Sequence, residues 1–221
     1  MYRLRRWQET VLDLHFELEG LEDFEAAVTE HCDRMIGERA TDRIFEDLCP
    51  MFGVIWPCAR ALSHRVARAE LGGRTLLELG CGLALPSLVA AQRGASVVAS
   101  DQHPDTERFL AANLARNDLV GRVRYASFDW RGELPDGLRE RCFDRVVASD
   151  VLYSALMVPQ VISAFDRFLA EDGVGWLADP GRTWLQDFAD DAARAGLRVS
   201  TTVEDGGPGG TEAFVLELRR A

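Results

Sequence analysis

The sequence contains no lysine, so all 25 of its basic residues are arginines, and these are outnumbered by 36 aspartates and glutamates. The formal net charge of −11 argues against a nucleic-acid partner, because such a partner is bound by a basic face that neutralises phosphates. An acidic body suits a cationic or protein substrate better. The complete bias toward arginine is typical of codon usage in a GC-rich genome, and we therefore expect a bacterial source.

Long apolar runs are also missing. No stretch approaches the roughly 18–20 uninterrupted apolar residues that a membrane span needs, and the N-terminus has no apolar signal core. The five cysteines are scattered without CxxC pairs, which indicates neither a disulfide framework nor a zinc site. We expect a soluble cytoplasmic protein with reduced thiols, no metal and no membrane partner.

From about residue 74 onward, short apolar runs alternate with helical patterns, which is typical of a parallel sheet with crossover helices. We predict seven strands, over 75–79, 96–100, 123–128, 145–149, 174–178, 197–203 and 213–218. Helices are predicted between them over 86–93, 104–117, 158–169 and 184–195. The segment 205–210 is rich in turn formers and too short for a helix, so the last two strands should form an antiparallel hairpin. The predicted fold is α/β and Rossmann-like: a seven-stranded, mostly parallel sheet with helices on both faces and an antiparallel last strand.

The first 70 residues do not follow that alternation. Apolar residues alternate over 12–18 as in a strand, and the segments 21–35 and 57–69 have helical patterns. No repeat or linker marks a second domain. We therefore predict an N-terminal extension over 1–55, packed on the core of one main domain over 56–221.

Ligands of an open α/β sheet bind at the carboxyl ends of its strands, and the first predicted parallel strand runs into a glycine-rich turn over 78–85 that leads into a helix. A dinucleotide fingerprint would require a further glycine at the position of Leu85, and the carboxylate of Glu78 would repel a pyrophosphate. Glu78 suits the ammonium end of an amino-acid ligand. The turn therefore favours S-adenosylmethionine over NAD, although a tight turn without a ligand is the structural alternative.

Acidic and aromatic residues follow the next two strands. Asp101 can accept both hydroxyls of a ribose, with a helix cap as the alternative role. Asp129 can accept from an adenine amino group while Trp130 packs on the ring, or Trp130 can be a plain core residue. Several suitable strand ends in order are much rarer than any one of them.

These residues, together with the Asp-Val-Leu-Tyr motif at 150–153, resemble the class I methyltransferases, and more narrowly the DxxY group of protein lysine methyltransferases. The segment 54–62 resembles the tryptophan-containing entry helix of that group. The Asp-Pro-Gly-Arg motif at 179–182 resembles the one in lysine methyltransferases that act on the electron-transfer flavoprotein β-subunit. The resemblance covers about residues 45–218, whereas the first 40 residues match nothing that would name a substrate.

The resemblance implies roles for individual residues. It places the glycine turn along the methionine part of S-adenosylmethionine, Asp101 at the ribose, Trp130 at the adenine and Trp56 over the cofactor. The implied cofactor-binding residues are Trp56, Glu78, Gly80, Cys81, Gly82, Asp101, Gln102, Asp129, Trp130 and Ser149. Asp150 and Tyr153 would border the acceptor pocket and are the catalytic candidates, with a helix cap and a core aromatic as their structural alternatives. One departure is Ala84, where the class often has a third glycine.

The methyl group of a sulfonium is already activated, so the protein mainly has to align the acceptor, and no metal is required. We expect a protein-lysine N-methyltransferase in which Asp150 orients the amine and Tyr153 contacts it. A small-molecule amine methyltransferase, similar to nicotinamide methyltransferases, is one alternative. A non-catalytic cofactor-binding protein is another, and an NAD-dependent oxidoreductase is disfavoured by Leu85 and Glu78. The sequence leaves the acceptor open between lysine and other nitrogens.

Overall fold

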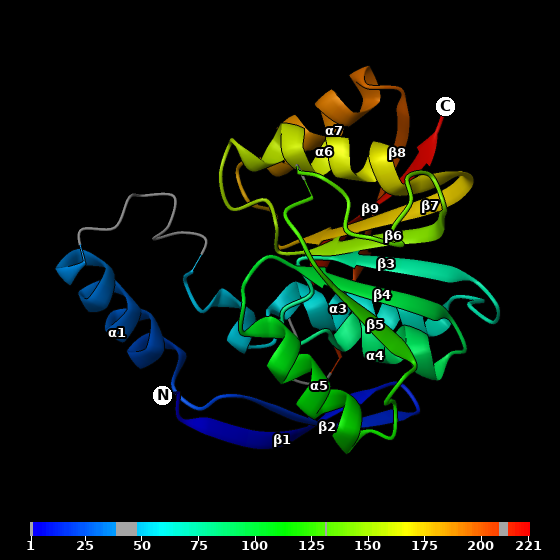
Figure 1. Ribbon diagram of the computed structural model, residues 1–221. Coiled ribbons are helices and arrows are strands. Elements are labelled where there is room, and N and C mark those ends of the chain that lie inside the picture. The colour runs from blue at the N-terminus through cyan, green and yellow to red at the C-terminus, as the bar shows by residue number, and fades with distance from the viewer. Residues whose placement is uncertain (1, 39–47, 131, 208–211) are drawn as a thin grey trace.

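The computed structural model describes residues 2–38, 48–130, 132–207 and 212–221, and its centre is a seven-stranded sheet (Figure 1). The strand order is β5-β4-β3-β6-β7-β9-β8. Neighbouring strands are parallel except β9, which is antiparallel to both β7 and β8. The strands are β3 (Thr75–Leu79), β4 (Ser96–Asp101), β5 (Val123–Ser127), β6 (Phe143–Ser149), β7 (Leu169–Asp179), β8 (Leu197–Glu204) and β9 (Ala213–Arg220). The predicted fold and the antiparallel final hairpin are confirmed; residues 208–211 of the predicted turn lie outside the described ranges.

Helices cover both faces of this sheet (Figure 1). One face carries α3 (Pro57–Arg68), α4 (Leu85–Gln92) and α5 (Thr106–Arg116), and the other carries α6 (Met157–Phe168) and α7 (Leu185–Arg194). Alternate strand residues point to opposite faces, so Leu76 and Val147 join the core under α3 and α4 while Leu77 and Val146 join the core under α6. Burial on both faces explains the nearly continuous apolar runs of the strands.

The largest error in a predicted strand boundary lies at β7. The strand expected over 174–178 begins earlier, because β7 starts at Leu169 directly after α6. Leu169 pairs with Phe143, and a register shift then separates this pair from the pairing of Arg145 with Val174. The exposed acidic residues within the extra length hid it from a hydrophobic pattern.

The N-terminal residues form a hairpin that the sequence reading captured only in part. β1 (Leu4–Val11) and β2 (Leu14–Leu21) are antiparallel, and α1 (Phe24–Gly37) and the short 3-10 helix η1 (Met51–Gly53) follow. β1 was missed because its residues are mostly polar or charged and exposed, which leaves no alternation of apolar residues. Leu12, expected within a strand, instead lies in the turn with φ of +55°.

The hairpin docks on α5 through two asparagine side chains that replace a neighbouring strand. Asn113 accepts from the Glu19 backbone N–H at 2.8 Å and donates to its carbonyl at 3.2 Å. Asn117 does the same for Glu17, at 2.9 and 2.8 Å. Phe16 of β2 is fully buried in the core under α3 and α4. The hairpin thus shares the core of the main fold, and the domain boundary at residue 55 stays a prediction.

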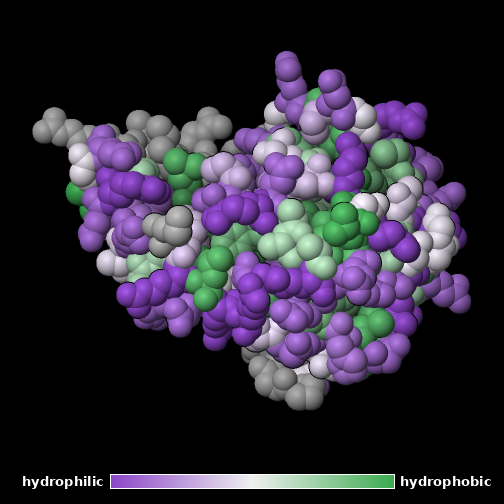
Figure 2. Space-filling view, turned by 60° about the horizontal axis from the view of Figure 1, so that its bottom comes forward, coloured by the Kyte–Doolittle hydropathy of each residue, from purple (hydrophilic) through white to green (hydrophobic). Residues whose placement is uncertain are grey.

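The outer surface seen from the hairpin side is mainly hydrophilic, with small hydrophobic areas between charged side chains (Figure 2). This agrees with the acidic composition of the chain. Within the described ranges, no helix has both the length and the apolar content to cross a membrane.

Candidate active site

The predicted ligand-binding residues gather where the strand order reverses. β3 has β4 on one side and β6 on the other. The chain that leaves β3 enters α4 on one face of the sheet, and the chain that leaves β6 enters α6 on the opposite face (Figure 1). The two connections therefore diverge at the carboxyl edge of the sheet, which is the edge where ligands of open α/β sheets bind.

The turn after β3 requires its glycines. Gly80 and Gly82 have φ of +65° and +49°, in the left-handed region that favours glycine. A Cβ on Gly82 would lie 3.1 Å from the Phe52 carbonyl oxygen, and one on Gly80 would lie 3.6 Å from the ring of Trp130. Cys81 donates its backbone N–H to the Ser100 carbonyl at 2.9 Å. The turn is therefore held close to β4, and the ring of Trp130 lies beside it.

Asp101, at the end of β4, ties this turn to the next loop. Its Oδ2 accepts from the Gly82 backbone N–H at 3.0 Å, and its Oδ1 accepts from the His103 N–H at 2.9 Å. Burial raises the pKa of Asp101, while both backbone N–H groups oppose that rise. A carboxylate has about four acceptor positions, so the group can still accept from a ribose hydroxyl.

Glu78 points away from the turn into the first turn of α4. Its Oε2 accepts from the Ser87 hydroxyl at 2.5 Å and from the Ser87 backbone N–H at 3.0 Å. The residue is 2% exposed, and burial raises its pKa to about 8. In the protein without ligand, Glu78 is therefore mostly protonated near neutral pH. Its predicted contact with a ligand ammonium stays a prediction.

Asp150 follows β6 and is held from two sides. Its Oδ1 accepts from Arg182 Nη2 at 2.9 Å, and its Oδ2 accepts from the Cys58 backbone N–H at 3.1 Å. The side chain is 6% exposed, and φ is +61°, a region that aspartate tolerates better than most residues. Burial raises the pKa of Asp150, and Arg182 and Cys58 oppose that rise.

The Cys58 contact makes Asp150 a cap for α3. Trp56 is the N-cap residue of that helix, and an indole has no oxygen with which to accept from the first turn. Asp150 supplies the acceptor from a different strand, where the positive end of the helix dipole favours a carboxylate. The capping alternative is therefore observed, although at a helix distant in sequence.

The residues 179–182 belong to the same cluster, which the sequence analysis noted only as a resemblance. Arg182 Nη1 donates to Asp179 Oδ2 at 2.9 Å while Nη2 donates to Asp150. Asp179 Oδ1 accepts from the backbone N–H groups of Gly181 and Arg182 at 2.9 and 2.7 Å. One guanidinium thus faces two carboxyl groups, so the cluster has one more acidic side chain than basic ones, which favours a cationic group nearby.

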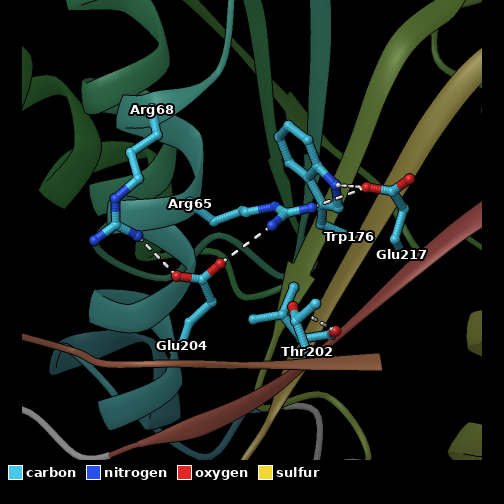
Figure 3. Close-up of polar contacts among 7 residues, drawn as sticks. Arg65, Arg68, Trp176, Thr202, Glu204 and Glu217 are labelled. Atoms are coloured by element: carbon cyan, nitrogen blue, oxygen red, sulfur yellow. Dashed lines mark hydrogen bonds and ion pairs between the residues drawn. The ribbon is translucent and has the colours of Figure 1, made fainter. Parts of the chain in front are cut away.

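The other end of α3 is anchored to the sheet (Figure 3). Arg65 pairs with Glu204 at 3.2 Å and with Glu217 at 2.9 Å, and Arg68 pairs with Glu204 at 2.7 Å. Trp176 donates from Nε1 to Glu217 at 3.3 Å. These contacts bind the C-terminal half of α3 to β8 and β9, and Trp176 links β7 to the same group through Glu217.

The remaining predicted residues lie around the same edge. Trp56 donates from Nε1 to the Met51 carbonyl at 2.9 Å, and its ring packs edge-on against Phe24, with ring centroids 5.6 Å apart. Tyr153 is 60% exposed. Gln102 is exposed, and Ser149 and Asp129 are partly buried at their strand ends. Across the described part of the chain, no group of three or more histidine, cysteine or acidic residues could hold a metal ion.

This architecture is that of the class I methyltransferases. The chain aligns with the Thermus thermophilus 16S rRNA N2 G1207 methyltransferase, solved with AdoMet and guanosine, at a TM-score of 0.65 and 19% identity, covering 99% of this chain and 51% of that one. A TehB-like SAM-dependent methyltransferase from Corynebacterium glutamicum gives a TM-score of 0.58 at 16% identity, covering 89% of this chain and all of that one (100%). At such identities the likeness establishes the fold.

The chain belongs to the lysine methyltransferase family, whose sequence profile matches residues 44–179. It is 30% identical over 126 residues to protein N-lysine methyltransferase METTL21A of Danio rerio, covering 55% of this chain and 57% of that protein. It is 31% identical over 178 residues to protein N-terminal and lysine N-methyltransferase EFM7 of Eremothecium gossypii, covering 68% and 65%. It is 43% identical over 103 residues to human histone-arginine methyltransferase METTL23, covering 45% and 54%. The alignments therefore cover between 54% and 65% of the length of these three relatives.

Proposed function

We propose that this protein is an S-adenosylmethionine-dependent protein-lysine N-methyltransferase. The observation that carries the proposal is the acidic cluster of Asp150, Arg182 and Asp179, which lies at the switch of strand order next to the glycine turn. Family membership supports the same activity. Activity on the β-subunit of the electron-transfer flavoprotein, which the Asp-Pro-Gly-Arg motif suggested, stays a prediction.

The cofactor half of the site fits the parts of S-adenosylmethionine. In this proposal Asp101 accepts the ribose hydroxyls, Trp130 packs against the adenine, and the turn between Gly80 and Gly82 lies along the methionine part. When bound, S-adenosylmethionine supplies an activated methyl group on a sulfonium sulfur. We propose that the other predicted cofactor-binding residues also contact S-adenosylmethionine: Trp56, Glu78, Cys81, Gln102, Asp129 and Ser149.

The acceptor half must bind and neutralise a lysine ammonium. With a pKa of about 10.4, a lysine amine carries a proton at neutral pH, and the unprotonated form costs about 4 kcal/mol near pH 7.4. In this proposal the acidic cluster around Asp150 attracts and orients the ammonium. A neighbouring negative charge favours the protonated amine, so the proton has to leave to solvent as the amine is desolvated for transfer, which favours its uncharged form. The exposed Tyr153 ring can contact the cation through its face.

The exposure of Tyr153 favours a protein acceptor over a small amine. A small amine would be enclosed by its enzyme, whereas a lysine on a protein needs an open approach, and Tyr153 is 60% exposed. The acidic charge of the chain favours a protein partner over nucleic acid, as it did in the sequence analysis. We also propose a cytoplasmic, bacterial enzyme without a membrane partner, in which residues 1–55 extend the main domain.

The test is transfer of labelled methyl from S-adenosylmethionine into a lysate of the source cells, with Asp150→Asn as the control. Asparagine suits the left-handed backbone at this position better than alanine, so the variant removes charge without added strain. We expect a labelled protein band that disappears with the variant, and peptide mapping that assigns the label to lysine. Because the chain has no lysine, label in its own band cannot be lysine methylation.

Two results would contradict the proposal. Label confined to the small-molecule fraction would assign a small-amine methyltransferase. The absence of label, despite measurable cofactor binding, would assign a non-catalytic cofactor-binding protein.

A further inference from the structure

We propose that Arg182 is a positioning residue for methyl transfer, which holds the Asp150 carboxylate in the orientation that receives the acceptor amine. The inference rests on the proposed function and adds to it a residue that acts through Asp150. Arg182 joins Asp150 to Asp179 with one guanidinium nitrogen on each carboxylate, both at 2.9 Å. Such charge-assisted contacts of a planar guanidinium fix direction as well as distance.

Asp179 is the fixed end of this bridge. Its side chain is 0% exposed, it lies at the end of β7, and one of its oxygens accepts from two backbone N–H groups. The guanidinium of Arg182 is therefore held by a fixed residue of the sheet. Its second contact holds Asp150, which lies at the end of the neighbouring strand β6.

The short loop from Asp179 to Arg182 is shaped to return the arginine side chain to Asp150. Gly181 has φ of +92°, and a Cβ at this position would lie 2.9 Å from the ring of Phe214. Only glycine combines this backbone conformation with so close an aromatic neighbour. The loop thus passes under Phe214 and places the guanidinium beside Asp150, at the solvent boundary, with 27% of the arginine side chain exposed.

Three elements face the Asp150 carboxylate. α3 contributes the backbone N–H and thiol of Cys58, the loop after β7 contributes Arg182, and β7 itself contributes Asp179 through Arg182. Burial raises the pKa of Asp150 and Arg182 holds it down. Loss of the guanidinium therefore raises the pKa of Asp150 further, so the ionised form needed to orient an ammonium appears only at higher pH.

The test compares Arg182→Gln, Arg182→Lys and the control Arg194→Gln on the full chain. Arg194 is 72% exposed and pairs with Asp191 within α7, so its variant removes an ion pair away from the cluster. Two quantities are measured for each variant. One is the pH profile of kcat/KM for the substrate protein identified in the lysate, and the other is the dissociation constant of S-adenosylmethionine by calorimetry. Arg182→Lys carries the only lysine of the chain, so its intact mass is followed to separate methylation of the enzyme from methylation of the substrate.

We expect Arg182→Gln to lower kcat/KM near neutral pH by about 100-fold, the effect of misplacing a reacting group by about 1 Å. The acid limb of the pH profile of kcat/KM should move to higher pH by about one unit or more, which is the usual effect of removing a neighbouring opposite charge. Cofactor affinity should change by less than about twofold. Arg182→Lys should restore the acid limb, and Arg194→Gln should match the wild type.

An equal loss of cofactor affinity, or a fall in activity with an unmoved acid limb, would overturn the proposal and assign Arg182 a purely structural role. A second measurement is independent of the substrate: the pKa of Asp150, followed by carboxyl-carbon NMR with Asp150→Asn for assignment. An unchanged pKa in Arg182→Gln would also overturn it. Absence of transfer by the wild type would instead defeat the proposed function, while the NMR titration still tests the bridge.

Discussion

Glu78 provides a prediction about stability that follows from its burial. In the folded protein its pKa is raised from 4.5 to about 8, because burial penalises the charged form more than the two contacts from Ser87 favour it. Between these two values the folded state keeps the proton and the unfolded state loses it. The free energy of unfolding therefore decreases as the pH rises through this window.

The size of the effect follows from the shift. A rise of about 3.5 pKa units, at about 1.36 kcal/mol per unit, corresponds to about 5 kcal/mol lost between about pH 4.5 and pH 8. Glu78→Gln keeps the size of the side chain and an oxygen that accepts from Ser87, but it does not titrate. The difference in the free energy of unfolding, variant minus wild type, should therefore increase by a few kcal/mol as the pH rises from 5 to 9.

The assay is urea unfolding of both proteins across this pH range, with the exposed Glu107→Gln on α5 as the control. Parallel pH dependences for wild type and Glu78→Gln would refute the reasoning and show that Glu78 is ionised in the fold. Calorimetry in buffers of different ionisation enthalpy extends the test to function. If the ammonium of S-adenosylmethionine meets Glu78, binding near pH 7 should release close to one proton.

Three further predictions concern single side chains. Asn113→Ala should lower the free energy of unfolding by about 2–6 kcal/mol in urea, because the Glu19 N–H and C=O each lose their partner at about 1–3 kcal/mol; a loss below about 1 kcal/mol would show that water replaces the amide. Gly82→Ala should cost at least about 1–2 kcal/mol from its φ of +49°, measured by thermal unfolding against Gly72→Ala, whose added Cβ has no neighbour within 4 Å; equal stabilities would contradict a strained turn. Asp101→Asn should weaken S-adenosylmethionine binding at least tenfold in calorimetry, at about 1.5–3 kcal/mol for each lost contact with the carboxylate, and an unchanged dissociation constant would place the ribose elsewhere.

The order and type of the sheet elements follow from local sequence. Apolar runs of five or six residues, ended by glycine or aspartate and separated by helical patterns, gave the seven strands of the sheet and the reversed last strand. The signal is strongest for β3, β4, β6 and the second half of β7, whose residues are mostly buried on both faces. It fails at β1, whose charged residues lie on an exposed hairpin, and at the start of β7, whose extra residues are partly exposed and acidic.

The candidate site divides in the same way. Its cofactor half is read along the chain, because a glycine turn and an aspartate each follow directly from a strand end and meet wherever parallel strands are adjacent. Gly82 and Asp101 are 19 residues apart, and the backbone N–H of Gly82 donates to the Asp101 carboxylate. Glu78 has the expected position in the chain, but its side chain faces α4 rather than the turn. The reason is that a carboxylate accepts from any donor within hydrogen-bond distance, and here Ser87 is that donor.

Sequence by itself therefore determined the class of fold, the edge of the sheet that carries the site and the kind of chemistry proposed there. Only the tertiary structure decided which partners hold Asp150: Cys58, 92 residues earlier, and Arg182, 32 residues later. The physical reason is that hydrophobic period and turn chemistry act over neighbouring residues, whereas hydrogen bonds and ion pairs depend on where separate elements meet in space.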